Sequence, residues 1–291
     1  MERGISFPMD QPDPASGLLD NIQEFATLPT VYSALISILS DPKATTQDVS
    51  DAISCDQASA MKVLKVVNSP FFGFPGEIDT ISRAVVILGF NEIYHLILTS
   101  YLIDFFSKNE EILDFRPVDF WGHSIAVGVA TRLIGKNLDL PNPENYFVTG
   151  VLHDIGKLIF FEYAEDRFAE VLAFSQKNRV PLAVAEKAVF QTDHSEIGSL
   201  LAERWGLPRS IGRAVRYHHS GIVPDEQDPL TAAVHLANIL CRALELGYGG
   251  DDFIPQPNPK TLEILRTKPE VLKEITPELI KNYEETVRIF I

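Results

Sequence analysis

Apolar residues at helical spacing run through almost the whole chain, and this pattern limits the fold more than any other feature. Clear examples are Val63, Leu64 and Val67, the stretch 121–133, and the stretch 230–244, which is apolar nearly all round. Short alternating segments rich in β-branched residues, with hairpin turns between them, are almost absent. The sequence therefore predicts an all-α protein with about a dozen helices.

Changes in composition divide this chain into four parts. Residues 1–16 are polar and contain three prolines, which predicts a flexible tail. One histidine precedes the Arg116-Pro117 pair and six follow it, so we expect an N-terminal helical part over 17–116 and a helical bundle over 117–248. A polar stretch with three more prolines begins the last part, and we expect a linker and a C-terminal helical tail over 249–291.

The charge balance and the cysteines indicate where such a chain works. It has 40 acidic and 25 basic side chains, a formal net charge of −15 and no run of Lys and Arg, which disfavours nucleic acid as a partner. Cys55 and Cys241 lie far apart in the sequence, so we expect no disulfide framework. The longest uncharged stretch, 25–40, has 16 residues and contains Pro29, which is too short for a membrane span. With no signal-peptide core after the N-terminus, we expect a cytoplasmic protein that enters no membrane.

His153 and Asp154 lie within or beside a buried helix, because apolar residues recur at helical spacing through 148–155. A carboxylate in such surroundings is costly unless it is paired or bound to a metal. Adjacent His and Asp side chains can hold one cation together, and the two carboxylate oxygens can bridge two cations. A salt bridge from Asp154 to Lys157, three residues on, explains the aspartate but not the histidine.

Four further histidines lie at predicted helix ends or in apolar stretches. His123 lies within 121–133, and His194 follows Asp193, which with Glu196 predicts a capping box that starts a helix. The pair His218-His219 closes a predicted helix over 211–217. Imidazole and carboxylate are ligands of zinc, iron, manganese and nickel, and donors on several helices suit a site in a bundle core. The alternative is a metal-free core in which the histidines bond to one another.

Asp228-Pro229 predicts the start of another helix, with Asp228 as the N-cap and Pro229 as the first residue. In this helix the stretch 230–244 carries its polar residues on one stripe, which continues to Glu245. The other members are Thr231, His235, Asn238 and Arg242. Such a stripe faces water, or its N-terminal half faces a polar cavity.

Taken together, these residues resemble the HD superfamily of metal-dependent phosphohydrolases and, within it, the HDOD (HD-related output domain) subgroup. The resemblance covers about residues 18–245 and is carried by His123, His153-Asp154-Ile155-Gly156-Lys157, Leu28-Pro29, the stretch 63–69, Ile87-Leu88-Gly89, Thr192-Asp193-His194 and Trp205-Gly206-Leu207-Pro208.

The resemblance implies an N-terminal helical subdomain packed on an HD-type helical bundle, with a centre for divalent metal ions, most simply two. The implied ligands are His123, His153, Asp154, His194, His218, His219 and Asn238. Asp154 would bridge the ions, and Lys157 would act with it in catalysis by contacting a substrate phosphate. Because this donor set has nitrogen and oxygen but no thiolate, iron or manganese is favoured, with zinc or nickel as alternatives.

Two departures from the superfamily pattern argue against catalysis. Asn238 stands where the superfamily has an aspartate, and His235, one turn earlier, is the alternative residue to complete the site. The Gly-Tyr-Pro sequence of the HD-GYP phosphodiesterases does not follow His218-His219, which disfavours cyclic di-GMP hydrolysis.

Two functions follow as hypotheses. The first is a bacterial-type signalling or regulatory output protein that retains the metal site and acts on a signalling protein partner. The second is a metal-dependent phosphohydrolase or phosphodiesterase for a phosphate-containing small molecule. Asn238 makes the first the preferred interpretation, since a complete carboxylate set would favour the enzyme.

Overall fold

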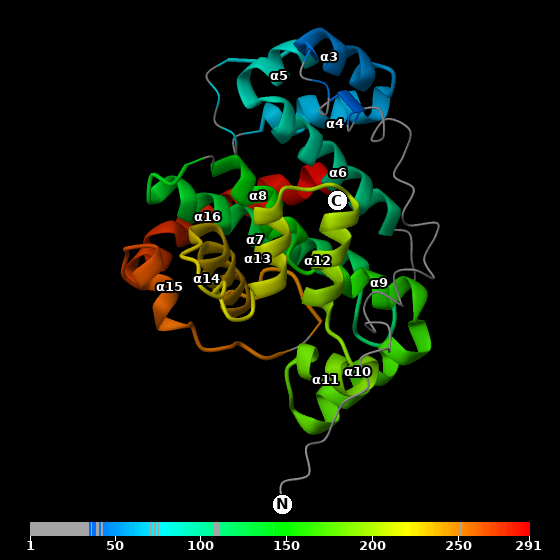
Figure 1. The fold of residues 1–291 in the computed structure, drawn as a ribbon, viewed down its shortest axis with the longest axis vertical. Coiled ribbons are helices and arrows are strands. Elements are labelled where there is room, and N and C mark those ends of the chain that lie inside the picture. The colour runs from blue at the N-terminus through cyan, green and yellow to red at the C-terminus, as the bar shows by residue number, and fades with distance from the viewer. Residues whose placement is uncertain are drawn as a thin grey trace, which may run out of the picture.

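The protein is described by a computed structural model that covers residues 43–69, 76–106, 111–141, 143–250 and 252–291, with a few single positions between 35 and 74. The predicted tail and Leu28-Pro29 lie outside the described residues. Within them the chain is helical and forms no named strand, only two isolated bridges, Ile112 with Phe115 and Val223 with Glu226. The all-α prediction is confirmed (Figure 1).

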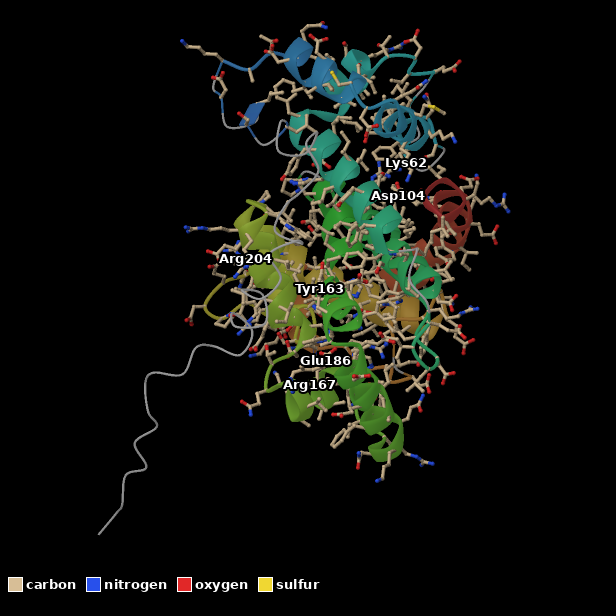
Figure 2. All side chains as sticks on the ribbon, turned by 90° about the vertical axis from the view of Figure 1, so that its right-hand side faces the viewer. Lys62, Asp104, Tyr163, Arg167, Glu186 and Arg204 are labelled. Atoms are coloured by element: carbon tan, nitrogen blue, oxygen red, sulfur yellow. The ribbon has the colours of Figure 1, made fainter. Side chains whose placement is uncertain are left out.

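The first helices form a group at one end of the molecule (Figure 1). They are α3 (Thr46–Ser54), α4 (Gln57–Val67), α5 (Ile81–Leu88) and α6 (Phe90–Phe106). Thr45 starts α3 with a capping box, and Thr80 accepts a hydrogen bond at the start of α5. Lys62 of α4 pairs with Asp104 of α6 across the contact between these two helices (Figure 2).

The remaining helices build a bundle and its extensions. They are α7 (Pro117–Asn137), α8 (Pro143–Leu152), α9 (Gly156–Tyr163), α10 (Glu165–Asn178), α11 (Leu182–Phe190), α12 (His194–Arg204), α13 (Arg209–Tyr217), α14 (Pro229–Ala243), α15 (Pro259–Ile264) and α16 (Glu270–Phe290). The α6 helix packs on α8, and Tyr94 of α6 donates a hydrogen bond to the carbonyl of Trp205. The N-terminal group is thus packed on the bundle, as the family resemblance implied.

The centre of the bundle is α7. Every residue from 120 to 135 is buried, because α8, α14 and α16 pack around this helix. Gly128 of α7 and Gly150 of α8 let the two backbones touch: a Cβ on Gly150 would lie 2.7 Å from the Cα of Gly128. The histidine of α7 and the histidine that follows α8 are therefore carried by helices in direct backbone contact.

The last part, 249–291, packs against the bundle. The α16 helix lies along α7 and also reaches α4, and Phe290 stands 6.3 Å from Phe147, measured between ring centroids. In the described part of the chain, no single helix is long and apolar enough to cross a membrane; the bent pair Ile81–Leu88 and Glu92–Phe106 meets the length and composition criteria only together.

Candidate metal centre

The structure brings all seven predicted ligand residues together. His123 comes from α7, His194 is the first residue of α12, and Asn238 lies on α14. His153 and Asp154 lie in the turn between α8 and α9, and His218 and His219 follow the last residue of α13. Helical spacing continues through Ile155 in the sequence, but the helix breaks after Leu152, so the two residues lie beside a helix and not on it.

Local signals in the sequence explain how two of these helices are placed. Asp193 caps α12 by accepting a hydrogen bond from the backbone N–H of Glu196, which brings His194 into the first turn as predicted. Asp228 caps α14 and Pro229 is its first residue, so the start of this helix was also predicted. The side chain of Glu196 accepts from Thr192 and does not complete the capping box.

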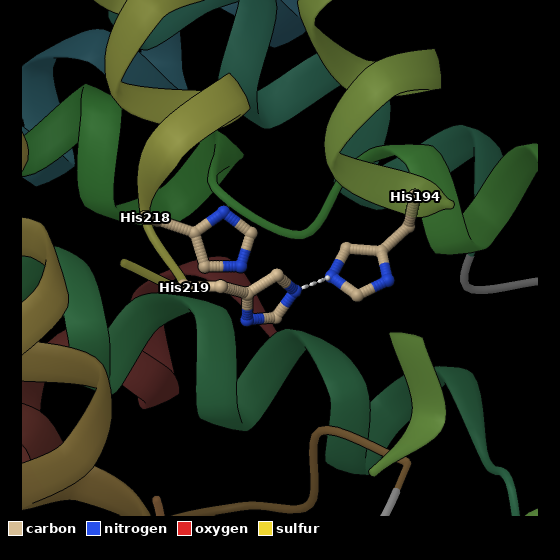
Figure 3. Close-up of side chains that lie close together, drawn as sticks. All are labelled: His194, His218 and His219. Carbon is tan, nitrogen blue, oxygen red and sulfur yellow. Dashed lines mark hydrogen bonds between the residues drawn. The ribbon is translucent and has the colours of Figure 1, made fainter. Parts of the chain in front are cut away.

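The donor atoms form two groups that share one region of the core. His123, His153 and Asp154 make one group, and His194, His218 and His219 make the other; in each group the donor atoms lie within 4.8 Å of one another. Figure 3 shows the second group, in which the Nε2 atoms of His194 and His219 are 2.9 Å apart.

Asp154 lies between the two groups and turns one oxygen toward each. Its Oδ1 is 3.1 Å from Nε2 of His194 and 3.4 Å from Nε2 of His218. Its Oδ2 is 3.2 Å from Nε2 of His153. The carboxylate therefore has the orientation that a bridge between two cations requires, which was the role expected of it.

Three of the histidine rings are oriented by hydrogen bonds from Nδ1. His153 donates to the carbonyl of Gly150 at 2.7 Å and His218 to that of Val215 at 2.7 Å. His194 donates to Oε2 of Glu186 at 2.6 Å. In a neutral ring, an Nδ1 that donates leaves Nε2 as an acceptor, so each of these rings can present a lone pair to the centre, His194 only after it has lost its second proton.

Several of the central donor atoms are buried without a hydrogen bond. Among the described residues, Nε2 of His153, Oδ1 of Asp154 and Nε2 of His218 have no hydrogen-bond partner. Leaving such atoms unsatisfied costs about 1–3 kcal/mol each. Cations held by the two donor groups would satisfy all three atoms, so the residues present fit a metal centre.

Burial and neighbouring charges set the protonation of the cluster. Burial lowers the pKa of His123 to about 3 and that of His218 to about 4, which keeps both rings neutral, as metal ligands must be. Burial alone would also lower the pKa of His194, but Glu186 and Asp154 raise it to about 9. Burial alone would raise the pKa of Asp154, but His153 and Lys157 hold it well below its ordinary range.

Lys157 has the arrangement that the salt-bridge alternative anticipated. Its side chain is 2% exposed, and Nζ donates to Oδ2 of Asp154 at 2.6 Å and to the carbonyl of Gly249 at 2.7 Å. The ammonium group is therefore turned toward the carboxylate of Asp154. Its contact with a substrate phosphate stays a prediction.

The position of His235 argues against it as the completing ligand. Its Nδ1 donates to the carbonyl of His218, and its Nε2 accepts from the backbone N–H of Asn258. Both ring nitrogens are thus engaged. Asn238 has its Oδ1 3.1 Å from Nε2 of His123, which places the amide at the edge of the first group.

Glu186 was missed from the sequence. It is fully buried, accepts from both Nδ1 and the backbone N–H of His194, and so fixes this ring from behind. A signal did exist: Leu182, Glu186 and Phe190 are spaced by four, and both apolar members are buried, so the glutamate lies on the buried face of α11.

Two cavities reach the centre. One, of about 540 Å³, is lined by His219 and by residues of α11, α12 and α13. The other, of about 390 Å³, is lined by His123 and the segment after α14. Arg242 and Ile254 line both. We call them the His219 cavity and the His123 cavity.

Comparison with known sequences finds one family. The model of the HDOD domain matches residues 25–221. An uncharacterised protein of Treponema pallidum is 26% identical over 233 residues, and the alignment covers 79% of this chain and 45% of that one. YuxH of Bacillus subtilis, also uncharacterised, is 26% identical over 143 residues, covering 46% of this chain and 32% of that one. The chain spans less than half the length of these curated relatives.

Comparison with solved structures finds the same fold. An HDOD domain protein of unknown function from Geobacter sulfurreducens has a TM-score of 0.78 and 25% identity, covering 96% of this chain and 97% of that one. Two proteins of Shewanella amazonensis, named a candidate phosphohydrolase and a candidate metal-dependent phosphohydrolase, have TM-scores of 0.70 and 0.64 at 22% and 18% identity. Each comparison covers 95% of this chain and 98% of the other, and at these identities the likeness is one of fold.

Proposed function

Because the chain belongs to the HDOD family, we propose that it is a regulatory output protein that binds divalent metal ions at the histidine cluster and signals through a protein partner. The observation that carries the metal-binding part is the set of buried donor atoms without hydrogen bonds, on His153, Asp154 and His218. The orientation of Asp154 between two donor groups supports two ions. The nitrogen and oxygen donor set supports iron or manganese.

A second candidate is hydrolysis of a phosphate ester, favoured by the two cavities that reach His219 and His123. When bound, divalent cations supply Lewis-acid polarisation of a phosphoryl oxygen and lower the pKa of water. In this candidate Lys157 holds Asp154 ionised, and Glu186 holds the ring of His194. We rank it second because Asn238 stands in place of a carboxylate and Lys157 is bound to Asp154 and Gly249.

The metal content of the full-length protein tests the first proposal. Elemental analysis after purification is expected to find iron or manganese in the wild type and a loss in His153→Gln. His95→Gln is the matched control, since His95 is also a buried histidine but lies on α6, outside both donor groups. Metal-free wild-type protein that also binds no added Fe²⁺ or Mn²⁺ would exclude the proposal, and equal losses in the two variants would overturn the ligand assignment.

The second candidate is tested separately with metal-loaded protein. Hydrolysis of para-nitrophenyl phosphate and of its bis-ester is compared between the wild type and Asp154→Ala. Turnover that disappears in the variant supports the enzyme. Turnover that persists, or none in the metal-loaded wild type, rejects catalysis at this site.

A further inference from the structure

His235 links a proposed metal ligand to the C-terminal part of the chain. Its ring is buried, Nδ1 donates to the backbone carbonyl of His218 at 2.8 Å, and Nε2 accepts from the backbone N–H of Asn258 at 3.0 Å. Both bonds require the neutral ring with its proton on Nδ1. One imidazole therefore joins the turn that carries His218 and His219 to the residue that precedes α15. We call this turn, residues 218–221, the ligand turn.

The ligand turn is also held by the start of α15. Asn258, the N-cap of this helix, donates from its side-chain amide to the carbonyl of Ser220 at 2.9 Å. Gly221 ends the turn with a φ of +70°, and a Cβ there would overlap Thr261 and would lie 2.8 Å from Cγ of His235. The turn is thus enclosed between α14 and α15, so a shift of the turn displaces the start of α15.

A second tie lies beside the other donor group. The carbonyl of Gly249 accepts from Lys157, and a Cβ on Gly249 would lie 3.0 Å from Cδ2 of His123. Ile254, which comes between the two ties in the sequence, lines both the His219 cavity and the His123 cavity. The start of the last part of the chain therefore contacts both groups of proposed ligands.

The ligand turn would gain a further point of attachment from a bound cation. Nδ1 of His218 donates to the carbonyl of Val215, whereas its Nε2 is buried with no hydrogen-bond partner among the described residues. A cation at Nε2 would hold the ring from its second side. A turn with less freedom keeps its carbonyl groups in place for His235 and Asn258, so the bonds of both residues are strengthened.

We propose that His235 is a positioning residue that couples the metal centre to the C-terminal helices. Metal bound at the second donor group fixes the ligand turn, and the turn fixes Asn258 through His235 and Ser220. The α15 and α16 helices follow, and α16 packs on both α7 of the bundle and α4 of the N-terminal group. This coupling rests on the proposed metal binding and passes the occupancy of that site to helices outside it. Such coupling is reciprocal, so the docked C-terminal helices raise metal affinity in turn.

Hydrogen exchange of the full-length protein, followed by mass spectrometry, tests the coupling. The backbone N–H of Asn258 is itself the donor to His235, so peptides that cover 258–265 report on this bond, and they contain no proposed ligand. Saturation with Mn²⁺ or Fe²⁺, whichever binds more tightly, is expected to slow exchange there by about fivefold or more relative to protein in EDTA. Protein that binds the metal but exchanges at the same rate would overturn the coupling alone. Protein that binds neither ion would overturn the proposed function and the coupling with it.

Two substitutions separate the two bonds of His235. The amide nitrogen in His235→Asn can replace Nδ1 as the donor to His218, but no group then takes the place of Nε2. The amide oxygen in His235→Gln can replace Nε2 as the acceptor for Asn258, but no donor takes the place of Nδ1. Both variants are expected to lose the slowing by metal, because each breaks one link. His235→Gln is expected to bind the metal about tenfold more weakly than His235→Asn, since only the latter keeps the bond to the ligand turn.

A control and a third variant complete the experiment. His95→Gln, at a buried histidine outside both donor groups, should leave the metal affinity and the slowing unchanged. Equal affinities of the two His235 variants, which a merely structural role predicts, or slowing that persists in both, would contradict the assignment. Should both fail to fold, Asn258→Asp carries the test: its carboxylate can still cap α15, but the donor to Ser220 is lost, so the slowing by metal is expected to decrease. Slowing at the wild-type level in Asn258→Asp would then overturn the proposal.

Discussion

The buried pair of Lys157 and Asp154 allows a stability prediction that needs no metal. The ammonium group has two partners, Oδ2 of Asp154 at 2.6 Å and the carbonyl of Gly249 at 2.7 Å, and the side chain is 2% exposed. Asp154→Asn removes the negative charge and keeps the shape. The lysine then stays buried with two neutral partners.

The size of the effect follows from the geometry. At 2.6 Å and an effective dielectric constant of about 20, the Coulomb attraction is about 6 kcal/mol before desolvation. Desolvation of both charges offsets most of this, but breaking a buried pair from one side costs about 3–5 kcal/mol. The reverse change, Lys157→Met, should cost less, because Asp154 keeps His194, whose pKa near 9 leaves it protonated at neutral pH.

Urea unfolding in EDTA at neutral pH measures all four proteins: wild type, the two single variants and the double variant. We expect Asp154→Asn to be the more damaging single change, and the double variant to be more stable than the sum of the two changes predicts, by at least about 1.5 kcal/mol. Costs that add within about 0.5 kcal/mol would show that the two groups are not coupled. An Asp154→Asn cost below about 1 kcal/mol would refute the argument from burial.

Three further predictions concern the surroundings of this pair. Glu186→Ala is expected to lower metal affinity by about 10- to 100-fold, because it removes the hydrogen bond that orients His194. Glu186→Gln should have an intermediate affinity. Competition with a chromogenic chelator measures the affinity, and an unchanged value would mean that other contacts hold the ring. Gly156→Ala should destabilise the fold by at least about 1–3 kcal/mol, because the new Cβ would lie 2.1 Å from the carbonyl oxygen of His194. Gly212→Ala is the control: no atom lies closer than 3.7 Å to the new Cβ, so the change should be neutral or stabilising. Thermal unfolding that ranks the two variants the other way would contradict the packing. Folding lowers the pKa of Asp193 below its ordinary 3.8, because contacts with His194, Ser195 and Lys187 outweigh burial. The resulting stabilisation is complete above about pH 4 and is lost as the pH falls. The difference in stability between the wild type and Asp193→Asn should therefore shrink in acid, and a difference that grows there would contradict the argument.

Local chemistry decided most of what could be predicted. Helical spacing and the caps at Asp193 and Asp228 gave the fold class and the starts of two helices that carry site residues. The polar stripe of α14 also proved informative: all but the last of its members are at least partly buried, and His235, Asn238 and Arg242 lie at the site and its cavities.

Contacts between distant parts of the chain could not be predicted from the sequence, because they depend on which elements pack together. No local pattern indicates that the carbonyl of Gly249, from the predicted linker, accepts a hydrogen bond from Lys157 92 residues away. The engagement of His235 by Asn258 has the same origin. Every residue has a backbone carbonyl, so the sequence does not indicate which carbonyl in a predicted linker will accept a hydrogen bond from a distant side chain.

The backbone contact between Gly128 and Gly150 has a consequence for the metal preference of the proposed centre. Metal–ligand distances differ among common biological cations by only about 0.1–0.5 Å. A methyl group on Gly150 would begin 2.7 Å from the facing Cα, so the helices that lead to His123 and His153 would have to separate by about 0.7 Å to reach ordinary contact. That displacement exceeds the difference between one cation and the next. The spacing of the centre is thus set by two glycines that donate no ligand to it. A substitution at either glycine can change the metal preference although every ligand residue is retained.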